Sequence, residues 1–79
     1  MADFVELGRY VDRAEAIIMR GVLETNGIVT LTPELYTLAA DPGLIFALGG
    51  YRVMVPHDQL EAARALLRDV QRANEASPD

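Results

Sequence analysis

The order of strand-like and helix-like segments predicts an α+β domain, a two-layer ferredoxin-like sandwich in which two long helices cover one face of a small antiparallel sheet. Three observations support this prediction. Apolar residues alternate with a period of two in some segments, and they recur with helical spacing in others. The resulting order is β-α-β-(short α)-β-α. We expect one domain over residues 1–74 and a frayed tail over 75–79.

The first half of the chain contains a predicted strand, a helix and a second strand. Residues 4–10 alternate as a strand, and Asp12 with Glu15 forms a capping box at the start of a helix. We expect this helix to end at Asn26–Gly27 and residues 28–31, which are rich in β-branched side chains, to form the second strand. One helical stripe is predicted to be buried: Ala14, Ile17, Ile18, Gly21, Val22 and Thr25.

The middle of the chain is less regular. Thr32 and Pro33 favour a short helix, with Glu34 at its positive end. Asp41-Pro42-Gly43 has the order of a type II turn and is expected to stop that helix. The course of the apolar run 44–48 stays open at this point. The segment 35–48 is predicted either to cover the open face of the sheet or to form an oligomer or partner surface, because full exposure would leave a large apolar patch.

The last third of the chain contains a predicted strand and the second long helix. Gly49 and Gly50 allow unusual backbone dihedrals before a strand over 51–55, which Pro56 ends because it has no N–H to donate. Asp58 is predicted to cap the helix that follows, with Glu61 three residues later. The buried stripe of this helix is predicted to consist of Leu60, Ala63, Leu67 and Val70.

Composition limits the possible functions. The chain has 79 residues and no cysteine, which excludes disulfides and thiolate sites. Such a small domain buries only about 60% of its unfolded surface, so we expect a homo-oligomer. The net charge of −5 argues against nucleic acid and anionic membranes. No apolar run approaches the ~20 residues of a membrane span, and we expect a cytoplasmic protein.

The chemistry-bearing residues do not form a recognisable catalytic or metal set. His57 is the single histidine, so we expect no metal site, no cofactor and no catalytic residue. It is interpreted as an exposed residue before the helix, with ligand contact or pH sensing as the alternative. The stretch Gly50-Tyr51-Arg52 has some likeness to an RNA-recognition strand. However, the positions that would carry further stacking rings are Val53 and Val55.

Two stretches resemble a known family, EAIIMRGVLETNGI and LGGYRVMVPHDQLEAARALL. Their order and spacing are similar to the bacterial "putative prokaryotic signal transducing protein" family over about residues 4–71. The resemblance implies a ferredoxin-like fold related to the PII (GlnB-like) signalling proteins, and it implies no ligand or reaction. In PII proteins the loop between the second and third strands contacts partners, and the corresponding position here is the segment 35–48.

These observations lead to two functional hypotheses. The first is a non-catalytic regulatory module that binds a protein partner, or a second copy of itself, through Tyr36, Leu44, Ile45 and Phe46. The alternative is a small-molecule sensor whose ligand lies between protomers, near Tyr51, Arg52 and His57.

Overall fold

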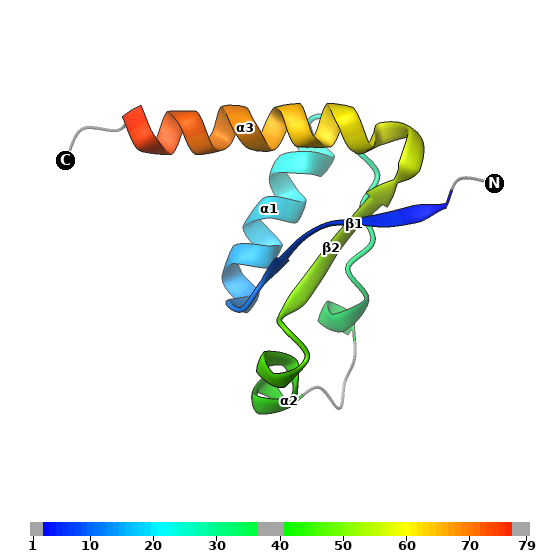
Figure 1. Cartoon of the computed structure of the whole chain (residues 1–79), viewed down its shortest axis with the longest axis vertical. Helices are drawn as coiled ribbons and strands as arrows, with labels where there is room; N and C mark the ends of the chain where they lie inside the picture. Colours follow the sequence, from blue (N-terminus) through cyan, green and yellow to red (C-terminus); the bar gives the residue numbers. More distant parts are fainter. Residues whose placement is uncertain (1–2, 37–40, 77–79) are drawn as a thin grey trace.

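The protein is a flat α+β molecule. The computed structural model describes residues 3–36 and 41–76, and the chain extends over 41 × 37 × 18 Å. Figure 1 shows two strands side by side, with α1 beside them and α3 crossing one end of the sheet and continuing past α1. The elements, in order, are β1 (Phe4–Tyr10), α1 (Arg13–Thr25), the 3₁₀ helix η1 (Pro33–Tyr36), α2 (Pro42–Ala47), β2 (Tyr51–Pro56), the 3₁₀ turn η2 (His57–Gln59) and α3 (Leu60–Ala76).

The two strands form an antiparallel pair with two faces. We call the face that packs against the core the inner face, and the opposite one the outer face. Tyr10 is opposite Tyr51 and Val5 is opposite Val55, with a bulge between Glu6 and Gly8. Because side chains alternate along a strand, β2 directs Tyr51, Val53 and Val55 to the inner face. These three join buried residues of α1, α2, α3 and the segment after α1 in one core: Ala16, Leu23, Ile28, Ile45 and Ala63.

The predicted strand at 28–31 is wrong for the described structure. Only Leu31 pairs with β2, through backbone hydrogen bonds of 2.9 Å in each direction with Met54. The backbone N–H groups on either side of this bridge donate to side chains. The Val29 N–H donates to Oε1 of Gln59, and the Arg52 N–H donates to Oε1 of Glu34. Side-chain acceptors thus replace backbone acceptors next to Leu31, and the sheet consists of β1 and β2 with one additional bridge.

Helix α1 begins and ends where the sequence predicts. The Asp12 carboxylate accepts a hydrogen bond from the Ala14 N–H at 3.0 Å, and Gly27 follows the helix with φ of +83°. Its predicted buried face is wrong, however. Ala16 and Leu23 are fully buried, whereas Ile17 and Ile18 are 42% and 64% exposed. Apolar residues lie on both sides of this helix, so periodicity alone could not identify which side faces the sheet.

Helix α2 replaces the predicted turn at Asp41-Pro42-Gly43. The Asp41 carboxylate accepts from the Gly43 N–H at 2.8 Å, and Pro42 is the first helical residue, so the same three residues start a helix. After α2, Gly49 and Gly50 have φ of +96° and +110°, as expected from the glycine pair. The backbone of Tyr10 lies close to Gly50: a Cβ on Gly50 would lie 2.7 Å from the Tyr10 carbonyl oxygen.

The start of α3 also differs from the prediction. Asp58 lies inside the 3₁₀ turn η2, whose own N-cap is Pro56 without a side-chain hydrogen bond, and α3 begins at Leu60. Asp58 is therefore not the N-cap residue that the sequence predicts. Of the predicted stripe, Ala63 is fully buried, Leu60 packs against the core, and Leu67 and Val70 are half-buried. Leu66, which the prediction omits, also packs against the core. The helix runs to Ala76, two residues beyond the predicted domain boundary at 74, which stays a prediction.

Candidate functional site

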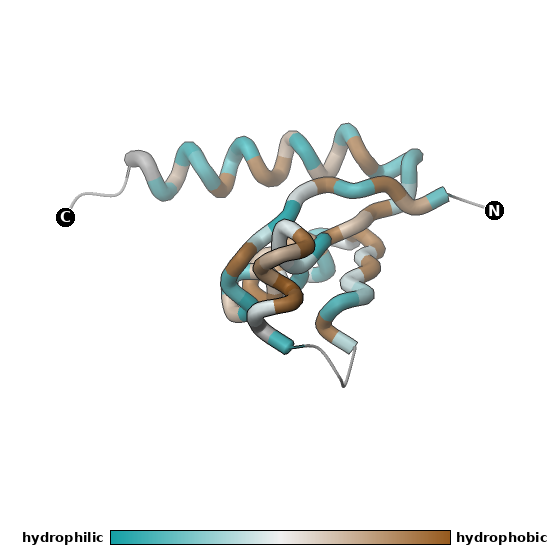
Figure 2. The backbone as a smooth tube through the Cα atoms, turned by 60° about the horizontal axis from the view of Figure 1, so that its bottom comes forward, coloured by the Kyte–Doolittle hydropathy of each residue, from teal (hydrophilic) through white to brown (hydrophobic). Residues whose placement is uncertain are grey.

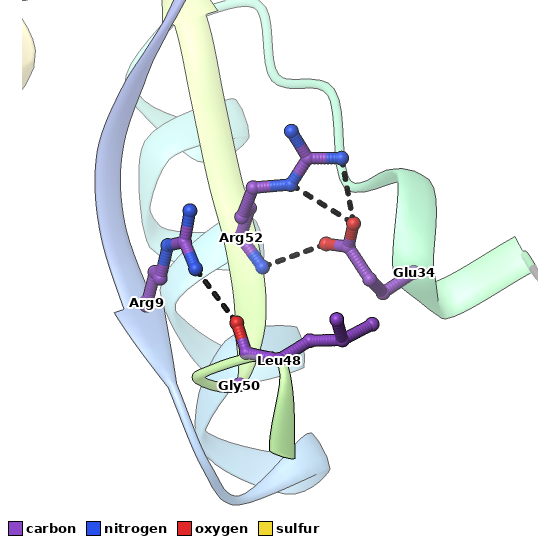
Figure 3. A pocket seen from close by; sticks show the side chains of 5 residues that line it. All are labelled: Arg9, Glu34, Leu48, Gly50 and Arg52. Carbon is purple, nitrogen blue, oxygen red and sulfur yellow. Dashed lines mark hydrogen bonds and ion pairs between the residues drawn. The ribbon is translucent and has the colours of Figure 1, made fainter. Parts of the chain in front are cut away.

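The outer face of the sheet carries an ion pair built around Glu34. The Glu34 carboxylate accepts three hydrogen bonds from Arg52: from its backbone N–H (2.8 Å), from Nε (2.9 Å) and from Nη2 (2.7 Å). This arrangement fastens η1 to the edge of β2 (Figure 3). The Glu34 side chain is only 16% exposed, so this pair is more sheltered than an ordinary surface salt bridge.

A second ion pair lies beside the first. Arg9 is opposite Arg52 in the strand register, so two cations occupy adjacent positions on the outer face. Like charges in this arrangement repel, and each arginine has its own carboxylate. Arg9 Nε donates to Oε2 of Glu6 at 2.7 Å, and its Nη1 donates to the Leu48 carbonyl at 2.8 Å. The result is a charged row across the outer face, in which two adjacent arginines are flanked by two carboxylates: Glu6, Arg9, Arg52 and Glu34.

This row changes the acidity of its two carboxyl groups. Burial raises the pKa of Glu34, but the hydrogen bonds and positive charge of Arg52 lower it by more, so its pKa lies below the ordinary value. The hydrogen bond from Arg9 likewise lowers the pKa of Glu6. Both carboxylates are therefore held ionised, which suits structural ion pairs and opposes the near-neutral pKa that general acid–base catalysis requires.

A small pocket opens between the charged row and the end of α2. It has a volume of about 240 Å³ and is lined by Arg9, Glu34, Leu48, Gly50 and Arg52. Figure 3 shows the two arginines on neighbouring strands, with Leu48 extending toward Glu34. Pockets that hold drug-sized ligands usually measure ~300–1,000 Å³, so this pocket suits a small polar group or a single side chain of a partner.

Next to this pocket, α2 presents an apolar surface that we call the α2 surface, consisting of Leu44, Phe46 and Leu48. These side chains are 54%, 71% and 58% exposed. Figure 2 shows the turns of α2 coming forward with mostly hydrophobic colours. Three large apolar side chains exposed within five residues form a local patch of the kind that marks interaction sites.

The predicted partner-binding residues divide into two groups. Leu44 and Phe46 are exposed on α2, and Tyr36 is 62% exposed in η1, with the Arg20 guanidinium 5.2 Å above the centre of its ring. Ile45 is a correction: it is 4% exposed and packs into the core, because it is the side chain that anchors α2. Ile45 therefore supports the α2 surface and is not part of it.

The predicted ligand residues Tyr51, Arg52 and His57 do not meet. Tyr51 is buried on the inner face at 8% exposure, whereas Arg52 points to the outer face. His57 is exposed and begins the turn after β2, a strand of six residues that spans about 20 Å. Within one chain these three side chains do not form one site, and of the three only Arg52 lines the pocket beside the charged row. A ligand held between protomers stays a prediction.

Sequence reasoning missed Arg9, Glu34 and Leu48 as members of one site. The position of Glu34 at the start of a helix is a sufficient local explanation for it, and no neighbouring residue indicates that it reaches Arg52, 18 residues away. A signal was available for the arginines, because each occupies an outward position of a strand. The register that pairs them is a long-range property of the fold, so their meeting could not be read from spacing.

Comparison with known proteins identifies the family. The sequence profile of the family described as "putative prokaryotic signal transducing protein" matches residues 4–71, which is most of the chain. The chain belongs to this family. No curated protein and no solved structure matches it.

The description of this signal-transducing family indicates a regulatory role and gives no partner, ligand or mechanism. No helix in the described residues is long and apolar enough to cross a membrane. Among those residues there is also no group of three or more histidine, aspartate or glutamate side chains placed to hold a metal ion.

Proposed function

We propose that this member of the signal-transducing family is a non-catalytic regulatory module that binds a protein partner through the α2 surface and Tyr36. The exposure of Leu44, Phe46 and Leu48 beside the buried Ile45 is the observation that carries the proposal. Among the described side chains of this helix, Ile45 is the one in the core, and Leu44 and Phe46 present apolar area to solvent. Such exposure costs solubility unless a partner covers it.

The charged row supports the same interpretation, because it borders the apolar residues. Leu48 belongs to the α2 surface, and it also lines the pocket with Arg9, Glu34 and Arg52. Protein interfaces commonly combine an apolar centre with a polar rim. A matching partner would bring an apolar or aromatic side chain to Phe46 and polar groups to the rim.

We interpret the two strands and the Leu31 bridge as a reduced ferredoxin-like sheet related to that of PII proteins. The support is the order of elements and the single core that joins α1, α3 and β2. By fold-level analogy, the segment that contains η1 and α2 takes the place of the PII loop that contacts partners. That analogy agrees with the exposed side chains on α2, and the proposal does not depend on it.

Catalysis is the less supported function for this site. The charged groups of the outer face are engaged in ion pairs, and the pKa values of Glu6 and Glu34 are lowered. A catalytic acid or base works best with a pKa close to the working pH. The proposal therefore treats the row as structural support and rim, without a reaction.

The test is affinity capture from the protein's own cells with three versions of the chain: wild type, Phe46→Asp and Val29→Asp. Val29 is the matched control, because it is also apolar and 53% exposed but lies outside α2. We expect a partner that wild type and Val29→Asp retain and that Phe46→Asp loses at least about tenfold, as for a hot-spot aromatic. Equal retention by all three versions would contradict the proposal.

A second candidate function is sensing of a small polar metabolite in the pocket at Arg52. The observation in its favour is the pair of adjacent guanidinium groups, Arg9 and Arg52, around about 240 Å³ of open space. A ligand would have to compete with Glu34 for Arg52. Thermal-shift screening of wild type and Arg52→Gln against a metabolite panel tests this function: a wild-type shift that Arg52→Gln abolishes supports it, and no shift contradicts it.

A further inference from the structure

Helix α1 is apolar on two opposite sides. Its inner side packs on the sheet through Ala16 and Leu23, which are fully buried. Its solvent side also consists mostly of apolar or small residues, and we call it the α1 outer face: Ala14, Ile17, Ile18, Gly21 and Thr25. A surface helix normally has one apolar stripe and a polar opposite side, and a helix that is apolar all round is normally covered.

Gly21 has no explanation within the described chain. It lies in the middle of a 13-residue helix, where glycine is less favourable than alanine because it gives up more backbone freedom on folding. A Cβ at this position would meet nothing within 4 Å, so no close neighbour in the described chain requires glycine. Glycine in such a position allows the backbone of a second helix to approach closely.

Two charges along one flank of α1 are placed against its dipole. Arg13 is the first residue, near the positive end of the helix, and Glu24 is in the last turn, near the negative end. The two residues are eleven positions apart, about three turns, so they lie in line along the same flank. Arg13 is exposed, and the Glu24 side chain, which pairs with Arg20 at 3.4 Å, is still 48% exposed.

We propose that the α1 outer face binds a second copy of this chain, with the two α1 helices antiparallel across a twofold axis near Ile18. A helix reversed in this way has its Glu24 beside Arg13 of the first copy, and the second contact follows by symmetry. Each charge then also lies at the favourable end of the partner's dipole. Ile17 of each copy packs over Gly21 of the other, where no Cβ stands in the way.

This pairing explains three features together: the apolar solvent side, the mid-helix glycine and the two reversed charges. The length of the paired helices also indicates how tightly the dimer associates. The helix is about 20 Å long, so the contact belongs to the small, transient class of interfaces. We therefore expect a reversible dimer that forms between micromolar and millimolar chain concentration.

The decisive experiment is sedimentation velocity over that concentration range, with wild type, Arg13→Glu, Glu24→Arg and the double reversal. Each single reversal places two like charges together at both ends of the interface, and should raise the dimer dissociation constant at least about tenfold. The double reversal restores opposite charges and should recover most of the affinity. Each single reversal also improves the match to the helix dipole. Glu24→Arg in addition removes the contacts of Glu24 with Arg20 and Thr30, which lie at the surface and contribute little, so the monomer stays folded.

Two further variants complete the test. Gly21→Ala should raise the thermal midpoint of the monomer, because alanine favours the helix, and should weaken the dimer by filling the point of closest approach. Phe46→Asp should leave self-association unchanged, which separates this surface from the proposed partner site. The proposal is overturned if wild type stays monomeric throughout, if the double reversal fails to recover, or if Phe46→Asp abolishes the dimer.

Discussion

The α1 outer face and the α2 surface both expose apolar side chains, but the molecule supports them in different ways. The first lies on a 13-residue helix whose opposite side is fixed by Ala16 and Leu23, both fully buried. The second lies on a six-residue helix of which, among the described side chains, Ile45 packs into the core. The α1 outer face should therefore tolerate changes elsewhere in the chain, whereas the α2 surface depends on a few supporting contacts.

The difference also separates the roles that we propose for the two surfaces. A regular helix with a symmetric charge pattern suits a second copy of the same helix. A short helix beside a mixed-charge pocket presents several kinds of group in a small area, which suits a different protein. If this contrast is correct, changes to the supports of α2 should affect partner capture and leave self-association intact.

The largest expected effect comes from Gly50→Ala, at the junction between α2 and β2. The φ of Gly50 is +110°, and a Cβ there would lie 2.7 Å from the Tyr10 carbonyl oxygen and 2.9 Å from the carbonyl carbon. Both atoms belong to the backbone, so the strand or the junction has to move. We expect a loss of about 3 kcal/mol or more in the free energy of unfolding, measured by urea denaturation.

Gly27→Ala is the matched control for this prediction. Gly27 also has a positive φ, +83°, but a Cβ there would meet nothing within 4 Å. The backbone strain of alanine at a positive φ should by itself lower the free energy of unfolding by about 1–2 kcal/mol. Equal losses for the two variants would show that the close approach of Tyr10 to Gly50 does not govern the junction.

The next largest effect is expected from Ile45→Ala. Ile45 is 4% exposed and is the α2 side chain in the core. Removing a buried side chain of this size costs about 2–4 kcal/mol. Phe46→Ala, at 71% exposure, should cost less than about 0.5 kcal/mol in the same urea titration. Similar losses for both variants would contradict the assignment of anchor and contact residue.

A smaller effect than that of Ile45→Ala is expected from Glu34→Gln, and it depends on pH. The pKa of Glu34 is lowered in the folded protein, so its stabilising contribution is complete above the ordinary value of 4.5 and is lost as the pH falls through the folded pKa. At neutral pH the variant should lose about 1–2 kcal/mol of unfolding free energy, as expected for hydrogen bonds to a charged group.

Urea titrations of wild type and Glu34→Gln from neutral pH to about pH 3 test the sign of this linkage. The difference between the two proteins should shrink as the pH falls below 4.5. The pKa of Glu6 is lowered mainly by Arg9, and Glu34 has the smallest effect on it, so most of the Glu6 contribution cancels in the comparison. A difference that stays constant or grows toward low pH would show that the Glu34 charge does not stabilise the fold.

Local signals predicted the elements that local physics determines. The alternation over 4–10 and over 51–55, the Asp12 cap and the positive φ of Gly49 and Gly50 all follow from neighbouring residues. The family was also identified from the sequence, and its profile matches the same range, 4–71.

The errors arose where distant groups compete. Residues 28–31 have strand-like composition, but carboxylate and amide side chains occupy the positions beside Leu31 that a third strand would pair. Asp41-Pro42 is compatible with both a turn and a helix start. The helix is favoured because it places Ile45 in the core. For α1, two apolar sides made the buried one ambiguous, and Ile17 and Ile18 were assigned to the wrong side.

The most direct test of the contrast is photo-crosslinking in the protein's own cells, with a photoreactive amino acid replacing Phe46, Ile18 or Val29 in turn. These positions are 71%, 64% and 53% exposed, so all three are accessible in the monomer. We predict an adduct with a different protein at position 46, an adduct with a second copy of the chain at position 18, and neither at position 29. Absence of a foreign adduct at 46, or the same adduct at 46 and 29, would contradict the central claim that the α2 surface binds the partner.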